Sequence, residues 1–231
     1  MPYTYEYPKA DFTVDAIVFG VGEGGLEILL IKRGDNPFKG HWALPGGFVN
    51  MDETIEAAVQ RELQEETGAK IDFLEQLYTF GDPGRDPRGR VVSVAYYGLV
   101  SSKEHHVVGD DDAEEARWFP LSDVTGKLPL AFDHAKILKM GVERLRGKIR
   151  YAPIGFNLLP KSFTLGQLQK IYETILGREL DKRNFRKRIL AMEILKETGG
   201  IYRAAHRPAK LYRFDKRAYN AAVKDGFNFE I

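Results

Sequence analysis

The sequence predicts an α/β domain followed by a smaller, basic domain of helices and one hairpin. Apolar runs separated by glycines alternate with a helical pattern in the first part of the chain. The charge also reverses near residue 150. The first 150 residues hold 18 Lys plus Arg against 25 Asp plus Glu, a net −7, whereas residues 151–231 hold 16 against 8, a net +8. This reversal indicates two domains with different partners.

Composition limits the class of protein. A chain of 231 residues with 43% hydrophobic and 29% charged residues is typical of soluble globular proteins. The absence of cysteine excludes disulfides and thiolate metal sites. The N-terminal segment has no basic stretch followed by an apolar run, and no 18 apolar residues occur in succession. We therefore expect a cytoplasmic protein with no membrane partner.

The first domain is predicted to begin with two strands and a turn. Residues 13–19 and 27–31 are rich in β-branched and apolar residues, with four glycines between them. Residues 91–100 and 116–119 read as further strands, and a helical stretch covers about 132–146. The boundary is expected near residues 151–155, which gives domains of 1–150 and 151–231.

A helix is predicted between these groups of strands. Thr54 is a suitable N-cap, and Gly68 is a natural residue to end the helix. Paired glycines at 46 and 47 allow a strand to turn tightly into it. An apolar stripe at i, i+4 and i+8 can hold the helix against a core, and it consists of Ile55, Val59 and Leu63.

Three carboxylates share one face of this helix. Glu62, Glu65 and Glu66 stand at i, i+3 and i+4, where like charges destabilise a helix by roughly 0.2–0.5 kcal/mol per pair. Arg61 alone cannot neutralise all three. Clustered hard oxygen ligands suit Mg²⁺ or Mn²⁺, so a divalent cation is the functional interpretation. The alternative for such a charge run is a solvated acidic helix face.

The whole segment resembles the Nudix box, the signature of hydrolases that split a nucleoside diphosphate linked to another group. The matching residues are Gly47, Glu53, Arg61, Glu62, Glu65, Glu66 and Gly68. The resemblance implies an α/β/α sandwich with a mixed sheet, where periodicity alone indicates only α/β.

The resemblance also implies roles for individual residues. Glu62, Glu65 and Glu66, with the backbone carbonyl of Gly46, are the expected metal ligands, and Arg61 is expected to orient Glu53. Water would attack one phosphorus while the cation polarises the phosphoryl oxygens. Nudix enzymes take their general base from different places, and we look for it in the acidic run at 110–115, with Glu115 as the candidate. A solvated surface loop is the alternative for that run.

Two further segments bear on the substrate. The turn-rich stretch 80–90 carries Arg85, Arg88 and Arg90, whose guanidinium groups suit pyrophosphate oxygens. This stretch and residues 37–47 resemble the Nudix branch that acts on ADP-ribose. Phe38 can stack on an adenine, although aromatic residues beside a strand are more often core. For the arginines, the alternative is an exposed hairpin loop.

The basic domain follows a pattern of helix, turn, basic helix and basic hairpin. Thr164 can cap the first helix, Gly177 marks the turn, and Asp181 can cap the second helix, which we expect to continue through apolar residues to the break at Gly199 and Gly200. Two strand-like runs follow at 201–204 and 209–214. This order predicts a winged helix-turn-helix whose second helix enters the major groove of DNA.

The basic side chains of this domain are the predicted DNA contacts. Asn184 and Arg188 can read base edges, while their neighbours hold phosphates. Solvation of an outer helix face is the alternative. The full predicted set is Lys182, Arg183, Asn184, Arg186, Lys187, Arg188, Arg203, His206 and Arg207.

The combination of domains resembles the Nudix-related (NrtR-like) transcriptional regulators over nearly the whole chain. In that family the front domain binds ADP-ribose or a related metabolite, and the back domain represses genes of NAD synthesis. Many members have a degraded box, whereas this box is intact, so we expect both binding and hydrolysis with Mg²⁺. A homodimer on a palindromic DNA operator is expected, because one winged helix reads few base pairs. The alternatives are an ADP-ribose pyrophosphatase with a basic tail and an arabinose-type sugar sensor.

Overall fold

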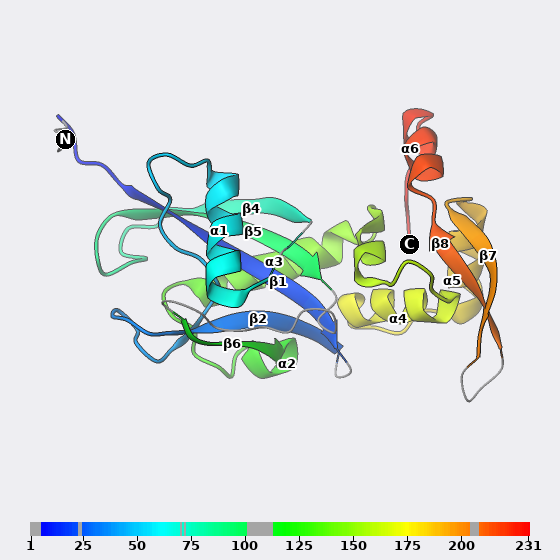
Figure 1. Ribbon diagram of the computed structural model, residues 1–231, viewed down its shortest axis with the longest axis horizontal. Coiled ribbons are helices and arrows are strands. Elements are labelled where there is room, and N and C mark those ends of the chain that lie inside the picture. The colour runs from blue at the N-terminus through cyan, green and yellow to red at the C-terminus, as the bar shows by residue number, and fades with distance from the viewer. Residues whose placement is uncertain (1–5, 23–24, 70, 72, 101–112, 204–207) are drawn as a thin grey trace. The chain divides into compact units, whose positions relative to one another are not determined.

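The structure is a computed structural model that describes residues 6–22, 25–69, 71, 73–100, 113–203 and 208–231. The chain divides into two compact units, Met1–Val142 and Glu143–Ile231, and helix α3 (His134–Lys148) runs through the division (Figure 1). None of the helices in the described ranges combines the length and the apolar character needed to cross a membrane.

The first unit is built on a mixed sheet. β1 runs parallel to β5 and antiparallel to β2, while β4 adds to β5 and both β3 and β6 pair with β2, all antiparallel. The order is β3-β2-β1-β5-β4, with β6 on β2. The strands are β1 (Asp11–Gly22), β2 (Gly25–Arg33), β3 (Trp42–Ala43), β4 (Leu74–Phe80), β5 (Val91–Val100) and β6 (Ala113–Pro120).

Helices cover both faces of this sheet (Figure 1). Helix α1 (Ile55–Thr67) packs Val59 and Leu63 into one core cluster with alternate β1 residues such as Ala16. The next β1 residue, Ile17, faces the other way, where a Cβ on Gly141 of α3 would lie 2.2 Å from its Cδ1. The short α2 (Leu121–Val124) follows β6. The predicted α/β/α sandwich with a mixed sheet is confirmed.

The ends of α1 are set by local chemistry. The Thr54 side chain accepts a hydrogen bond from the Ala57 N–H at 3.2 Å, and Gly68 ends the helix with φ 66°. Both ends agree with the sequence prediction. The strands β3 and β4 are additional to it.

The second unit forms the predicted winged helix. Its 3₁₀ turn η1 (Pro153–Leu158) precedes α4 (Leu165–Leu176), α5 (Lys182–Ala191), the hairpin β7 (Leu195–Tyr202) and β8 (Ala209–Phe214), and α6 (Lys216–Lys224). Phe163, just before α4, exchanges two backbone hydrogen bonds with Tyr212 of β8, at 2.9 and 2.8 Å. Helices α4 and α5 contact each other through the rings of Tyr172 and Phe185, whose centroids are 5.7 Å apart.

The caps in this unit are those predicted, but the second helix is shorter. Thr164 caps α4 in a capping box, and Asp181 caps α5. The expectation that α5 continues to Gly199 is wrong, because the helix ends at Ala191 and Glu193 turns the chain with φ 54°. The two glycines instead lie at an irregular register within β7. Closely spaced apolar residues, such as those on both sides of Glu193, do not distinguish a helix end from a strand start.

Candidate functional site

Arg61 of α1 is the centre of a polar cluster. Its Nε and Nη2 donate to the Glu53 carboxylate at 3.0 and 2.7 Å. Its Nη1 donates to Glu62 at 2.8 Å and to Glu65 at 2.9 Å, and Nη2 also donates to the Phe48 carbonyl at 3.0 Å. The hydrogen bonds from Arg61 lower the pKa of Glu53 to about 2. The expected pairing of Arg61 with Glu53 is therefore present, and two of the three clustered carboxylates share one guanidinium nitrogen.

Glu66 is held differently. Its Oε2 accepts a hydrogen bond from the backbone N–H of Gly46 at 2.7 Å. Burial raises the pKa of Glu66 to about 8, and the nearby charge of Glu62 adds to this effect. Burial raises the pKa of Glu62 as well. Two carboxyl groups of the box are thus in surroundings that disfavour their charged form in the absence of a cation.

The loop before the helix needs glycine at two positions. Gly46 has φ 152°, and a Cβ there would lie 2.0 Å from the Val14 carbonyl oxygen. A Cβ on Gly47 would lie 2.4 Å from a carboxylate oxygen of Glu62. Val14 N–H donates to the Gly47 carbonyl at 2.9 Å, which fixes the loop to β1. The paired glycines therefore bring the backbone close both to the sheet and to the carboxylates of α1.

A cleft of about 730 Å³ opens beside this loop. Acidic and basic side chains face the same space, which is the arrangement needed by a ligand that bears phosphates and a bound cation. The cleft is lined by Thr13, Ile31, Arg33, Gly34, Asp35, Asn36, Gly47, Phe48, Asn50, Arg61, Glu62, Glu66 and Arg88.

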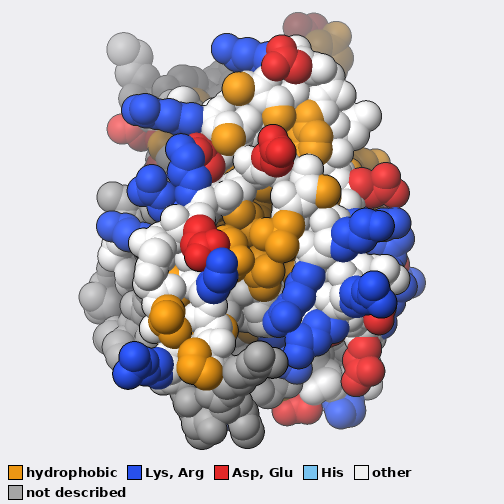
Figure 2. All heavy atoms as spheres, turned by 90° about the vertical axis from the view of Figure 1, so that its right-hand side faces the viewer, with side chains coloured by type: hydrophobic (Ala, Val, Ile, Leu, Met, Phe, Trp, Pro, Cys, Tyr) orange, Lys and Arg blue, Asp and Glu red, His pale blue; other side chains and the backbone are white. Residues whose placement is uncertain are grey.

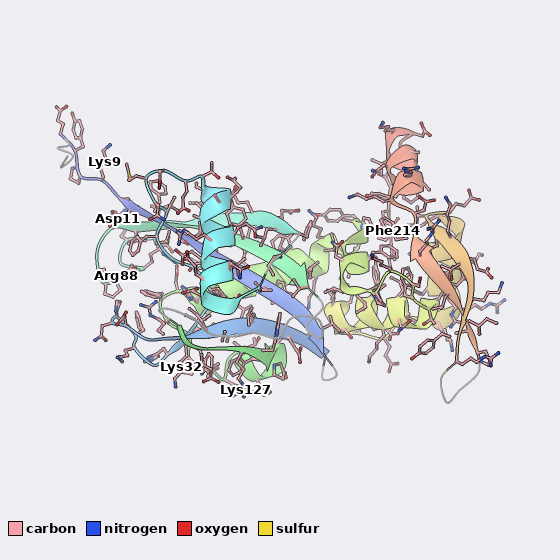
Figure 3. All side chains as sticks on the ribbon, in the orientation of Figure 1. Lys9, Asp11, Lys32, Arg88, Lys127 and Phe214 are labelled. Atoms are coloured by element: carbon pink, nitrogen blue, oxygen red, sulfur yellow. The ribbon has the colours of Figure 1, made fainter. Side chains whose placement is uncertain are left out.

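Arg88 is the one of the three predicted substrate arginines that lines the cleft. Figure 3 labels it on the loop between β4 and β5, at the end of the sheet where β1 begins at Asp11. Its Nε and Nη2 donate to Asp86 at 3.0 and 2.7 Å, and its Cζ lies 4.8 Å from the centroid of the Phe48 ring. The sequence analysis did not predict Arg33, which also lines the cleft. The sequence feature that could have identified it is an arginine at the end of a predicted strand.

Arg85 has a structural position instead of the predicted substrate contact. Its side chain is 4% exposed, and its Nη2 and Nε donate to the Asp133 carboxylate at 2.6 and 3.1 Å. Nη2 also lies 3.3 Å from Asp15 of β1. Asp15 is buried and Asp133 is partly buried, so both carboxylates of the scaffold hold this guanidinium, and Arg85 is not among the residues that line the cleft.

The same buried network supports the loop of the site. His134 lies 3.3 Å from Asp15, and its Nδ1 accepts a hydrogen bond from the Leu44 N–H at 2.9 Å. Burial alone would raise the pKa of Asp15, but contacts from His134, Ser93 and Arg85 outweigh it and lower that pKa to about 2. The network thus connects β1, β5, the 81–90 loop and the backbone just before Gly46.

The remaining predicted residues of this unit lie outside the cleft lining. Phe38 packs on Phe132 with ring centroids 4.8 Å apart, and Arg90 donates to the Gly81 carbonyl at 2.6 Å. Glu115 is exposed on β6, opposite Lys32 of β2. Glu115 is the one residue of the acidic run whose side chain is described, and it does not line the cleft; the side chains at 110–114 lie outside the described residues.

The donor set fits a hard divalent cation in its chemistry. Glu62 and Glu66 line the cleft with raised pKa values, and a Glu62 carboxylate oxygen lies 2.4 Å from where a Cβ on Gly47 would be. Across the described ranges, however, no three Asp, Glu, His or Cys side chains are gathered for metal binding. The contact of Arg61 with Glu62 and Glu65 accounts for this, because those carboxylates point to the guanidinium.

Helix α5 carries the predicted nucleic-acid contacts on its outer face. Phe185 and Ile189 are buried at i, i+4 and hold the helix against the core. At about 100° per residue, Arg183 and Lys187 then project on the opposite side. Arg186 is only partly exposed. The exposed polar residues of α5 are Lys182, Arg183, Asn184, Lys187 and Arg188.

The hairpin of β7 and β8, which is the wing of this domain, adds basic residues to the same unit. Arg203 follows β7 and is exposed, whereas His206 and Arg207 lie outside the described residues. A groove of about 540 Å³ beside α5 is lined by Asn184, Lys187 and Arg188 among others. Figure 2, which views the side of Figure 1 that carries α5 and the hairpin, shows clusters of Lys and Arg around a strip of hydrophobic side chains.

Comparisons with protein families agree with both halves of this description. The family model for the NUDIX domain matches residues 11–140. The family model described as the NrtR DNA-binding winged helix domain matches residues 155–214.

Individual proteins resemble the chain over most of its length. The ADPR responsive transcriptional repressor NtrR of Acinetobacter baylyi is 41% identical over 226 residues, covering 97% of this chain and 87% of the relative. An ADP-ribose pyrophosphatase of Methanocaldococcus jannaschii is 48% identical over 122 residues, 53% of this chain and 69% of that protein. The crystal structure of Shewanella oneidensis NrtR complexed with a 27mer DNA superimposes with a TM-score of 0.80 at 35% identity, covering 94% of this chain and 97% of that one.

Proposed function

Since the chain belongs to the NrtR family of Nudix-related transcriptional regulators, we propose that it is a repressor whose first unit binds ADP-ribose and whose second unit binds DNA. The resemblance inferred from the sequence is thereby confirmed at the level of the family. The cleft is the single observation that most directly supports this ligand, because Arg33 and Arg88 line the same space as Glu62 and Glu66.

The cleft residues have complementary tasks toward such a ligand. Guanidinium groups pair with phosphate oxygens through charge-assisted hydrogen bonds. Apolar walls from Ile31 and Phe48 can cover a ring of the ligand. A relative that responds to ADPR and another named ADP-ribose pyrophosphatase support ADP-ribose as the ligand.

We further propose that the first unit hydrolyses this ligand in the presence of Mg²⁺ or Mn²⁺. Glu62, Glu65 and Glu66 would hold the cation, with the backbone at Gly46, and the cation would polarise the phosphoryl oxygens. Arg61 keeps Glu53 ionised and orients the box helix against the loop. Water adds to one phosphorus and the bridging P–O bond breaks, which yields AMP and ribose 5-phosphate.

DNA binding is assigned to α5 and the wing. The outward positions of Arg183 and Lys187 suit the major groove and the phosphates beside it, and the exposed Asn184 and Arg188 stay available for the base contacts predicted from the sequence. The domain boundary proposed near residue 150 leaves the winged helix intact. We propose a homodimer on a two-fold operator, because paired half-sites supply the specificity that one winged helix lacks.

Calorimetry and product analysis on the full chain test the first unit. We expect ADP-ribose to bind in EDTA, and AMP to accumulate after Mg²⁺ is added. Glu66→Gln should keep binding in EDTA and lose AMP formation. Binding without any AMP from the wild type would leave a ligand sensor and remove the enzyme; no binding of ADP-ribose would remove the proposed ligand.

Selection from a random duplex library tests the second unit. The full chain should enrich a palindromic sequence at moderate salt. Recovery of unrelated duplexes only would favour the alternative, an ADP-ribose pyrophosphatase with a basic tail.

A further inference from the structure

His134 is a buried histidine that contacts two separate segments of the first unit. It begins α3, and its side chain is 5% exposed. Its Nδ1 lies 2.9 Å from the backbone nitrogen of Leu44, 90 residues earlier in the chain, and its Nε2 lies 3.3 Å from Oδ1 of Asp15 in β1. The imidazole therefore bridges the loop that contains Gly46 and the strand β1.

The partners of the ring decide which nitrogen carries the proton. A backbone N–H can only donate, so Nδ1 accepts from Leu44 and bears no proton. A neutral imidazole then carries its proton on Nε2, which faces the Asp15 carboxylate and can donate to it. Asp15 thus selects the tautomer of His134 that is able to accept from Leu44.

Asp15 is itself held from two further directions. The Ser93 hydroxyl of β5 donates to Oδ2 of Asp15, and Nη2 of Arg85 lies 3.3 Å from the same oxygen. A buried carboxylate with three partners has little freedom to turn. The direction of the His134 ring is therefore fixed by the assembled sheet.

The backbone of β1 holds the same loop on both sides of Asp15. The N–H groups of Val14 and Ala16 donate to the carbonyls of Gly47 and Pro45, at 2.9 and 2.8 Å. The side chain of Asp15 adds a third attachment through the imidazole. Three successive residues of one strand thus fix the loop.

Gly46 is the residue of this loop that meets the box helix. Its N–H donates to Glu66 at 2.7 Å, and its carbonyl accepts no hydrogen bond from the described residues. Leu44 stands two residues earlier and is buried, so its N–H would be left unsatisfied without the imidazole. A loop that moves to find another acceptor would displace both backbone groups of Gly46.

We propose that His134 is a positioning residue of the cation site: as the tautomer selected by Asp15, it holds Leu44 and so places the Gly46 backbone against Glu66. This role rests on the proposed Mg²⁺- or Mn²⁺-dependent hydrolysis and belongs to a residue outside the box. His134 is not among the residues that line the cleft, so its effect reaches the cation through the loop.

Two substitutions separate the two hydrogen bonds of His134. In His134→Asn, the side-chain carbonyl stands close to the position of Nδ1 and can accept from Leu44, but the shorter amide does not reach Asp15. In His134→Gln, the terminal amide can donate to Asp15 from the position of Nε2, and Leu44 loses its acceptor. Each variant keeps one hydrogen bond, so their thermal unfolding midpoints should fall alike.

Electron paramagnetic resonance of free Mn²⁺ measures cation binding by the full chain without any reaction. His134→Gln should weaken Mn²⁺ binding about 10-fold or more, the usual effect of removing a group that orients a metal ligand, and His134→Asn should stay within about threefold of the wild type. The kcat for AMP formation should follow the same order, while the affinity for ADP-ribose in EDTA stays within about threefold in both variants. A merely structural role would not distinguish the two variants.

Ser93→Ala is the matched control. It removes another hydrogen bond to Asp15 at a fully buried residue and leaves the bond between His134 and Leu44 in place. Arg85 continues to hold the carboxylate. The unfolding midpoint of this variant should fall, whereas its Mn²⁺ affinity should stay within about twofold of the wild type.

Nitrogen-15 spectra of the imidazoles test the tautomer in the wild type. His134 is recognised by its nuclear Overhauser contacts with the Phe132 ring, whose centroid lies 5.3 Å from its own. Its Nε2 should be protonated and its Nδ1 bare. A proton on Nδ1 would overturn the proposal, and this measurement decides if neither variant folds.

The remaining outcomes separate the role of His134 from the proposed function. A folded His134→Gln that binds Mn²⁺ within about twofold of the wild type overturns the role, and so does a His134→Asn that loses as much affinity as His134→Gln. If Mn²⁺ binding depends on the acceptor at position 134 but the wild type forms no AMP, the role stands and the hydrolysis falls. If the wild type binds no Mn²⁺, both fall.

Discussion

The backbone N–H of Gly46 and the carboxylate of Glu66 are joined by a hydrogen bond of 2.7 Å in surroundings that raise the pKa of Glu66 to about 8. One backbone group is too weak a partner to offset the burial of a full negative charge. The structure therefore favours the protonated form of Glu66 below about pH 8, and binding of a cation would favour the charged form instead.

The raised pKa of Glu66 predicts a pH dependence of stability. Because the folded-state pKa exceeds the ordinary value of 4.5, the folded state binds the proton more tightly than the unfolded chain. The stabilising contribution is complete below about pH 4.5 and is lost as the pH rises toward 8. Urea unfolding in EDTA between pH 5 and 8 should show this decline in the wild type and a flatter curve for Glu66→Gln.

Mg²⁺ should offset the destabilisation caused by ionised Glu66 only in a protein that has this carboxylate. At pH 8, Mg²⁺ should raise the thermal unfolding midpoint of the wild type by more than that of Glu66→Gln. Parallel pH curves for the two proteins, together with equal Mg²⁺ shifts, would refute the assignment of Glu66.

The buried contact of Arg85 with Asp133 predicts a large loss of stability on truncation. Arg85→Ala leaves the buried Asp15 and the partly buried Asp133 without their guanidinium, and removing one partner of a buried ion pair costs about 3–5 kcal/mol. The free energy of unfolding from urea titration measures the loss. Lys127→Ala removes an exposed ion pair of 3.8 Å with Asp123 and should cost less than about 1 kcal/mol. Equal effects of the two changes would contradict the structural role.

Gly47 is predicted to matter through contact with Glu62. In Gly47→Ala, the new Cβ would lie 2.4 Å from a Glu62 oxygen, so the carboxylate must move and any Mg²⁺-dependent AMP formation should fall at least about 10-fold. Gly68→Ala is the control, because it introduces strain at φ 66° with no atom within 4 Å. That variant should lose about 1 kcal/mol of stability and keep its activity. Normal activity in Gly47→Ala would place Glu62 outside the reaction.

The outer face of α5 predicts a graded effect on DNA binding. Lys187→Ala should weaken binding of the selected duplex and, if Lys187 contacts a phosphate, lower the salt slope by about 1. Arg183→Ala should cost about 1–3 kcal/mol if it reads a base. Lys224→Ala, an exposed lysine at the end of α6, should leave the affinity unchanged. Fluorescence anisotropy at several salt concentrations measures all three; an Arg183→Ala and Lys187→Ala pair without effect would move the interface elsewhere.

Local signals in the sequence account for what could be predicted. Thr54, Gly68, Thr164 and Asp181 act within one helical turn of their own position, so their capping roles follow from residue type and spacing. The Nudix pattern likewise lies within a single loop and helix. The extent of α5 did not follow, because the chain turns at Glu193 between apolar residues that fit either a helix or a strand.

Contacts between residues far apart in the sequence account for the features that could not be predicted. Arg85 meets Asp133 and Asp15 at separations of 48 and 70 residues, so its burial depends on the assembled sheet. The turn-rich composition around it predicted a substrate contact, with an exposed hairpin loop as the alternative. Arg33 is a single arginine at a strand end, and only the fold reveals that it shares the Phe132 ring with Arg88.

A repressor that responds to a ligand requires the ligand in the first unit to change DNA binding by the second. The direct measurement is the affinity of the full chain for its selected duplex, in EDTA, with and without saturating ADP-ribose. We expect the affinity to change by about fivefold or more, the usual lower range of coupling between two sites, and Arg33→Ala to need more ADP-ribose for the same change. An identical DNA affinity at saturating ADP-ribose would contradict the account.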